Sequence, residues 1–197
     1  MLSECLSALE SRCKSAHAKN AMTKFLTLLF ICFPLVAALD IRVGLAQQPL
    51  DGRDHIFQDQ LLDNLVGDWK ITRKFKTRTA ENTAKVEWVL NHQFLLIKMR
   101  DMNNPPQYEA NIYVGYDNAS ERYVAHWIDV FGGRFSETLG YGTRAGNSIK
   151  FVFEYPDGPF LNTFTWNPDK KSWTFLMEQK DRNGKWTMFA EDTLIRK

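Results

Sequence analysis

The stretch Asp68-Trp-Lys-Ile-Thr-Arg-Lys-Phe-Lys-Thr-Arg-Thr79 decides the fold class, because its side chains alternate along the chain. Trp69, Ile71 and Phe75 share one parity, whereas the other parity after Asp68 holds only Lys, Thr and Arg side chains. Successive side chains of a β-strand point to opposite faces. The alternation therefore predicts a strand with one buried and one solvated face.

The same period of two continues to the C-terminus and is interrupted by turn residues. Asp157-Gly158 and Asn183-Gly184 are dipeptides typical of two-residue hairpin loops. An open meander of this length would leave two unpaired edges, so we expect the sheet to close. The predicted fold class is all-β, a single antiparallel up-and-down β-barrel of about ten strands over residues 67–197. Its further strands are predicted around residues 84–90, 94–100, 108–117, 122–131, 135–142, 149–155, 160–166, 172–180 and 185–196.

A short segment before the first strand has the spacing of a helix. Its apolar residues recur every three or four positions, and Asp54 can accept hydrogen bonds from the first backbone N–H groups. We therefore predict a helix over residues 54–66, within a leader of residues 47–66, that closes one end of the barrel. Its apolar positions are Ile56, Phe57, Leu61, Leu62 and Leu65.

Residues 1–46 have the pattern of a secretory signal peptide with an N-terminal extension. A basic start at Met22-Thr-Lys precedes the apolar run from Phe25 to Leu39, and small residues precede the polar sequence that follows. This run is shorter than the roughly 20 apolar residues of a spanning helix, although a retained membrane anchor is the alternative. We expect cleavage after Ala46, with Ala38 as the competing site and Met22 as an alternative start. The predicted location is the periplasm or the exterior of the cell.

Charge and cysteine content argue against several classes of function. The chain has a formal net charge of +2, and residues 47–197 carry 20 basic and 20 acidic side chains. A neutral domain lacks the positive field that nucleic-acid binding requires. Cys5, Cys13 and Cys32 all precede Ala46, so we expect no disulfide, thiolate metal ligand or cysteine nucleophile in the barrel. No closely spaced histidine pair is present either, and we expect no metal site.

Leu65-Val-Gly-Asp-Trp69 resembles the Gly-x-Trp motif of the calycin superfamily, which includes lipocalins and fatty-acid-binding proteins. In such barrels the tryptophan plugs one end, and an arginine on the last strand stacks over it. Arg196 stands near the end of the last predicted strand. The resemblance therefore implies that Trp69 and Arg196 form a structural plug. An arginine over an indole is a cation–π contact worth about 0.5–2 kcal/mol.

Three further motifs are similar to those of a family of calycin-like bacterial domains of unknown function. The resemblance covers roughly residues 60–197 and departs from the pattern at His92, where we expect a glycine. Some calycin-like barrels bind haem through a histidine near the C-terminus. No histidine follows His126 here, so we expect no cofactor. The three motifs are Trp88-Val-Leu-Asn-His-Gln-Phe94, Tyr113-Val-Gly-Tyr-Asp117 and Trp127-Ile-Asp129.

Charged side chains on the apolar parity are the candidate ligand contacts. Arg73 falls on the apolar parity of its strand, and Glu137 and Tyr141 fall on that of theirs. An isolated buried charge costs several kcal/mol, so each needs a partner or a polar ligand. We predict that Arg73 and Glu137 line a cavity and orient a polar head group, with Tyr141, Trp173 and Phe175 also lining it. The alternatives are that a bulge turns either charge outward, or that they only neutralise charges at the barrel mouth.

Three functions remain open on this evidence. The first is an exported barrel that binds a small, largely apolar molecule with one polar end. The second is an enzyme on the same barrel, in which Glu137, Tyr141 and Arg73 do acid–base chemistry on a small hydrophobic substrate. The third is a structural protein whose barrel is filled by its own side chains.

Overall fold

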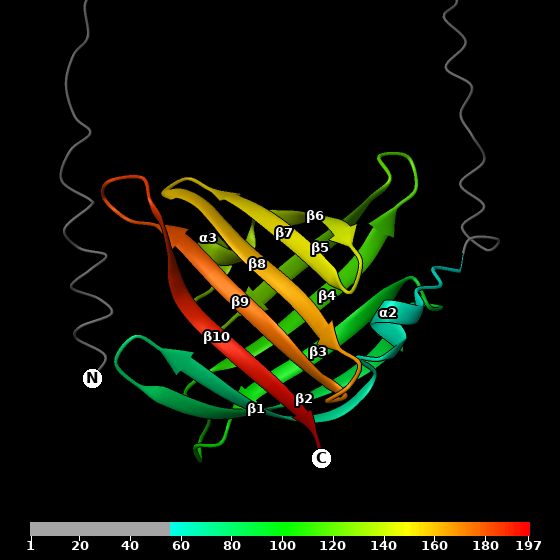
Figure 1. The fold of residues 1–197 in the computed structure, drawn as a ribbon, viewed down its shortest axis with the longest axis horizontal. Helices are drawn as coiled ribbons and strands as arrows, with labels where there is room; N and C mark the ends of the chain where they lie inside the picture. Colours follow the sequence, from blue (N-terminus) through cyan, green and yellow to red (C-terminus); the bar gives the residue numbers. More distant parts are fainter. Residues whose placement is uncertain (1–55) are drawn as a thin grey trace, which may run out of the picture. The chain divides into compact units, whose positions relative to one another are not determined.

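The computed structural model describes residues 56–197, which form a closed barrel of ten antiparallel strands (Figure 1). Each strand pairs with its neighbours in the sequence, and β1 pairs with β10 to close the sheet. The predicted all-β, up-and-down barrel is therefore confirmed. The strands are β1 (Gly67–Phe75), β2 (Thr79–Val89), β3 (Phe94–Asp101), β4 (Glu109–Asp117), β5 (Arg122–Asp129), β6 (Leu139–Ala145), β7 (Ser148–Tyr155), β8 (Gly158–Asn167), β9 (Ser172–Lys180) and β10 (Trp186–Arg196).

Two one-turn helices mark the two ends of this barrel. Helix α2 (Gln60–Asp63) precedes β1, and helix α3 (Gly133–Ser136) connects β5 to β6. The strands run alternately up and down. The barrel opening at which odd-numbered strands begin and even-numbered strands finish lies beside α2, and we call it the α2 end. The opposite end is called the α3 end. Among the described residues, no helix is long and apolar enough to cross a bilayer.

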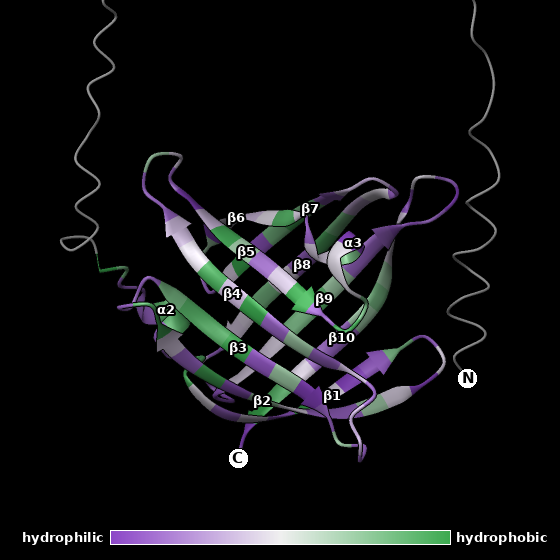
Figure 2. Cartoon of the chain, turned by 180° about the vertical axis from the view of Figure 1, so that it is seen from behind, coloured by the Kyte–Doolittle hydropathy of each residue, from purple (hydrophilic) through white to green (hydrophobic). Residues whose placement is uncertain are grey.

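The barrel interior is filled by one face of nearly every strand, and Figure 2 shows the strands banded by hydropathy. The middle of the interior is aromatic. The rings of Phe164 and Phe175 stack with centroids 3.7 Å apart, and Phe151 packs edge-on against Phe164. Trp173 and Phe175 are both fully buried. The centre of the barrel is therefore a packed core.

Strand β6 begins later than predicted, and its inward parity is reversed. Residues 135–138 were expected in the strand, but Phe135 and Ser136 belong to α3. Gly140 and Gly142 occupy the inward positions of β6, where a Cβ on Gly140 would lie 2.5 Å from the Phe153 ring. Glycine is required there because large side chains from β7 fill the space that a β6 side chain would need.

This shift corrects the predicted orientation of two candidate ligand contacts. Glu137 is exposed at the C-terminal cap of α3, and Tyr141 is 39% exposed on the outer face of β6. The guanidinium of Arg122 lies 3.7 Å from the centroid of the Tyr141 ring. Neither side chain points into the barrel.

The helix before β1 is shorter than the predicted 54–66. Residues 56–59 form neither helix nor strand, and α2 spans only Gln60–Asp63. Asp59 caps this helix, whereas the predicted cap, Asp54, lies outside the described residues. The Phe57 ring of the segment before α2 packs against Trp88 and two tyrosines, which holds this segment against the barrel. The predicted signal peptide in residues 1–46 also lies outside the described residues.

Trp69 and Arg196 are cross-strand partners at the seam between β1 and β10. The Arg196 guanidinium carbon lies 4.7 Å from the centroid of the fully buried Trp69 ring. Arg196 also donates hydrogen bonds to the carbonyl oxygens of Val66 (2.9 Å) and Asn64 (3.0 Å). The indole N–H of Trp69 donates to the carbonyl of Leu65. The pair ties the chain after α2 to the last strand.

Candidate functional site

A pocket of about 840 Å³ lies at the α2 end of the barrel. It is bounded on one side by the irregular segment before α2, and on the other by residues at or near the ends of β4, β5 and β6. Pockets of roughly 300–1,000 Å³ are typical of small-molecule sites. Its walls are residues 56–60, Gln93, Tyr116, Asn118, Glu121, Tyr123, Thr143 and Arg144.

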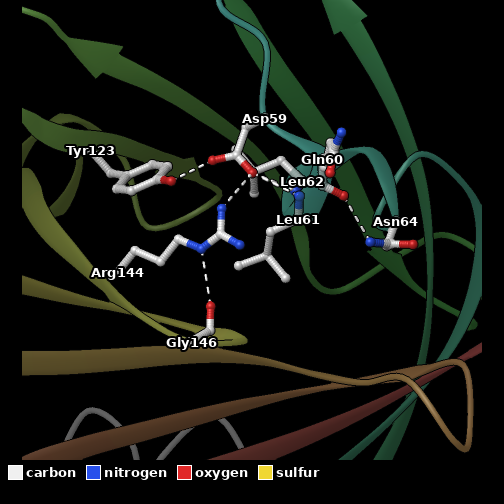
Figure 3. Close-up of polar contacts among 8 residues, drawn as sticks. All are labelled: Asp59, Gln60, Leu61, Leu62, Asn64, Tyr123, Arg144 and Gly146. Carbon is white, nitrogen blue, oxygen red and sulfur yellow. Dashed lines mark hydrogen bonds and ion pairs between the residues drawn. The ribbon is translucent and has the colours of Figure 1, made fainter.

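Asp59 is the most highly connected polar residue of this pocket (Figure 3). Its Oδ1 accepts hydrogen bonds from the backbone N–H groups of Leu61 (2.8 Å) and Leu62 (3.1 Å), which caps α2. Its Oδ2 accepts a hydrogen bond from the Tyr123 hydroxyl. Nη1 of Arg144 lies 3.3 Å from Oδ1, and the Asp59 side chain is only 4% exposed. The carboxylate is thus compensated on both oxygens.

Arg144 brings a cation from the end of β6 to the pocket. Its Nε donates to the carbonyl oxygen of Gly146 (3.0 Å), which holds the guanidinium beside Asp59. The side chain is 42% exposed. Because a guanidinium carries five N–H donors, an Arg144 side chain held in this way retains donors for a ligand.

Tyr123 reaches the same carboxylate from the start of β5. Burial, followed by its hydrogen bond to Asp59, raises the pKa of the Tyr123 phenol to about 12. The phenol therefore stays protonated near neutral pH and acts as a hydrogen-bond donor. Tyr123 is a positioning group for Asp59 and not a candidate base.

Phe57 and Tyr116 form the aromatic part of the pocket wall, and Trp88 packs behind Phe57. The rings of Phe57 and Tyr116 stack with centroids 5.7 Å apart, and Tyr116 meets Tyr123 edge-on at 5.2 Å. Trp88 contacts Phe57 edge-on and also stacks on His92 at 4.1 Å. A flat apolar group can pack against such a surface, while Arg144 supplies a polar contact at one edge.

Sequence reasoning missed this pocket, because two of its principal residues carry no distinctive motif. The predicted helix cap is Asp54. Asp59 stands two and three residues before Leu61 and Leu62, which is the spacing at which an N-cap side chain accepts from backbone N–H groups. Arg144 lies beyond the strand predicted over residues 135–142, whereas β6 continues to Ala145 and carries Arg144 to the pocket. Among residues 56–197, no group of three His, Cys, Asp or Glu is placed to hold a metal.

Arg73 does point into the barrel, where it faces a carboxylate. Its Nε and Nη2 lie 2.7 Å from the two carboxylate oxygens of Asp192, and Nη2 also contacts Sδ of Met99 at 3.3 Å. Burial alone lowers the pKa of Arg73, but the hydrogen bonds and charge of Asp192 outweigh it and raise the pKa above its ordinary value. Asp192 shares the inward parity of Leu194, a signal that sequence reasoning could have used.

The predicted site residues therefore do not converge on one cavity. Arg73 lies toward the α3 end, Trp173 and Phe175 lie in the packed core, and Glu137 and Tyr141 face outward. The arrangement that the acid–base hypothesis requires, with Arg73, Glu137 and Tyr141 around one substrate, is absent from the described residues.

The described residues define a class of protein: a closed ten-stranded antiparallel barrel with an aromatic and polar pocket beside its leading helix. The chain belongs to the family described as "Protein of unknown function (DUF1579)", whose model matches residues 57–196. Among solved structures it is similar to the crystal structure of Rv2717c from M. tuberculosis, with 12% identity and a TM-score of 0.47. That match covers 72% of this chain and 99% of the other. No curated protein matches the chain.

Proposed function

We propose that this protein is an exported, calycin-like barrel that binds a small, largely apolar molecule with a polar head group. The observation that carries the proposal is the pocket at the α2 end, where aromatic rings and a partly exposed Arg144 converge. The ligand's apolar part would pack on Phe57 and Tyr116, and its head group would accept hydrogen bonds from Arg144.

The ligand is proposed to bind at the α2 end because the centre of the barrel is filled by aromatic side chains. Fatty-acid-like occupancy of the centre would require space where Phe151, Phe164 and Phe175 contact one another. The pocket beside α2 needs no such rearrangement. It is bordered by Glu121 as well as Arg144, so a head group that only accepts hydrogen bonds would avoid Glu121 and seek Arg144.

Native mass spectrometry of the protein purified from its source tests the proposal. We expect a co-purified small molecule on the wild-type protein, lost from Arg144→Met because the head group loses its donors. Arg182→Met, in the exposed turn between β9 and β10, is the matched control and should retain it.

The second candidate is a structural protein with a filled barrel, which the packed aromatic centre favours. A wild-type protein that carries no small molecule would support that function and reject ligand binding in the pocket.

Export is a separate part of the proposal and rests on the sequence of residues 1–46. N-terminal sequencing of the protein recovered from the periplasm or medium should begin at Gln47, or at Leu39 if the competing site is used. A protein recovered only from the cytoplasm with an intact N-terminus would reject it.

A further inference from the structure

We propose a second ligand site at the α3 end, for an uncharged ring-containing molecule whose polar group has both a hydrogen-bond donor and an acceptor. A primary aromatic amide is the simplest example. This site is separated from the pocket beside α2 by the packed core and does not depend on the function proposed for that pocket.

The first observation is a set of aromatic side chains around the α3 end, which we call the aromatic rim. The ring centroid of Phe189 lies 6.0 Å from that of Phe75 and 5.5 Å from that of Phe160. The centroid of Phe160 in turn lies 6.3 Å from that of Tyr155. Near β4 and β5, the ring centroids of Tyr108 and Phe131 lie 6.1 Å apart. Phe131 is 61% exposed and Phe189 41% exposed, unusual values for phenylalanine. The rim consists of Phe75, Tyr108, Phe131, Tyr155, Phe160 and Phe189.

One inward-facing side chain behind this rim is less buried than its cross-strand partner. Trp127 has the inward parity of β5 and pairs with Ile112, which is fully buried, yet Trp127 itself is only half-buried. Its indole N–H donates to the Tyr108 hydroxyl at 3.1 Å, so the indole lies directly behind the rim.

The second observation is two asparagines whose buried amide atoms have no partner. Nδ2 of Asn82 and Oδ1 of Asn162 make no hydrogen bond within the described part of the chain, although the residues are only 2% and 1% exposed. Asn82 shares the inward parity of Ala84, and Asn162 that of Phe164. An unsatisfied buried donor or acceptor is costly, and native proteins normally supply it with a protein group, a water or a ligand.

Strand register places each asparagine within two positions of the Arg73–Asp192 pair. Asn82 pairs with Ile71, two positions from Arg73 along β1. Asn162 pairs with Met177, two positions from Phe175, and Phe175 pairs with Asp192. The interior around this ion pair therefore offers one free donor, Nδ2 of Asn82, and one free acceptor, Oδ1 of Asn162.

The charges of this region favour an uncharged ligand. Arg73 and Asp192 neutralise each other through two hydrogen bonds. Burial raises the pKa of the Asp129 carboxyl and of the Tyr108 phenol, which shows that this region disfavours added negative charge. An anionic group would meet Asp192 and Asp129, whereas a cation would find Asp192 already occupied by Arg73. A neutral amide can accept from Asn82 and donate to Asn162.

Three probes with the same ring system test this proposal: the primary amide of naphthoic acid, its carboxylate, and methylnaphthalene. Each is titrated into the isotope-labelled full-length protein and followed by NMR. The amide is expected to bind about tenfold more tightly than the other two, since only it can satisfy both asparagines. Chemical-shift changes should concentrate at the side-chain amides of Asn82 and Asn162 and at the rim.

The variant Asn162→Leu should weaken amide binding about tenfold and leave binding of methylnaphthalene unchanged, because it removes the polar amide that holds the free acceptor and keeps a side chain of similar size. Thr163→Val, on the opposite face of β8, is the matched control and should bind like wild type. Equal affinities of the wild-type protein for the three probes would overturn the proposal, as would shifts confined to the α2 end. So would the absence of binding, which would leave the asparagines to buried water. The wild-type measurement decides the matter even if a variant does not fold.

Discussion

Arg73 and Asp192 face each other directly across the seam where β10 closes onto β1, with both charges buried inside the barrel. Two parallel 2.7 Å hydrogen bonds join the guanidinium to the carboxylate. This geometry satisfies both groups and fixes the register of the one strand pair that links the two ends of the barrel sequence.

Removing one member of this pair should strongly destabilise the protein. Arg73→Met leaves Asp192 charged and unpaired where its side chain is fully buried, and should lower the free energy of unfolding by about 3–5 kcal/mol. The double variant Arg73→Met with Asp192→Leu should recover most of that loss, because no uncompensated charge remains. Urea unfolding measures both values. Lys70→Met, which breaks the exposed Lys70–Glu81 pair, is the control and should change stability by less than about 1 kcal/mol. A single variant as stable as this control would contradict the prediction.

Alkaline pH should weaken the attachment of α2 to the barrel. The pKa of Tyr123 is raised from its ordinary 10.0 to about 12, so the folded state favours the protonated phenol. The corresponding stabilisation is fully present below pH 10 and is lost as the pH rises through 12. Unfolding measured across this range should show the loss in wild type and a smaller loss in Tyr123→Phe.

Phenolate absorbance provides the check on this assignment. Burial also raises the pKa of Tyr155 to about 12, so Tyr123→Phe should remove one late-ionising phenol and retain another. If the alkaline limb of the stability curve is identical in wild type and variant, Tyr123 does not carry the effect.

The loop between β2 and β3 should respond differently to two small substitutions at His92. Leu90, Asn91 and His92 are consecutive residues with positive φ, at 51°, 54° and 64°. His92 offsets this strain by stacking on Trp88 and by placing its Nδ1 2.8 Å from the carbonyl oxygen of Phe57. His92→Ala loses these contacts and keeps the strain, whereas His92→Gly loses them and relieves it.

Thermal unfolding should therefore rank wild type above His92→Gly, and His92→Gly above His92→Ala by about 1 kcal/mol. The glycine expected from family resemblance would suit the backbone here but would not make the contact to Phe57. A His92→Ala variant as stable as His92→Gly would show that the left-handed conformation is not retained.

A methyl group added at Gly140 should strain the core. The new Cβ would lie 2.5 Å from the Phe153 ring, so Gly140→Ala should destabilise the protein by about 1–3 kcal/mol. Gly133→Ala adds the same group where nothing lies within 4 Å, and it serves as the control. Phe153→Leu combined with Gly140→Ala should recover part of the loss, as judged by urea unfolding. Absence of any such recovery would place the strain elsewhere.

The barrel could be predicted because strands joined by hairpins leave signals in short stretches of sequence. Alternating parity along β1, and the turn dipeptides Asp157-Gly158 and Asn183-Gly184, depend only on neighbouring residues. The error at β6 has the same origin. Alternation specifies two faces but not which one is inward, and the inward face of β6 is recognisable only when Phe151 and Phe153 of the next strand are seen to fill it.

Local patterns in the chain predicted the class of fold, about ten strands and an inward-pointing Arg73. The pairing of Arg73 with Asp192, and the convergence of Asp59, Tyr123 and Arg144 on one pocket, became apparent only in the folded barrel. These contacts join residues between 64 and 119 positions apart. Their formation depends on strand register and closure around the whole barrel, which no local pattern in the chain can encode.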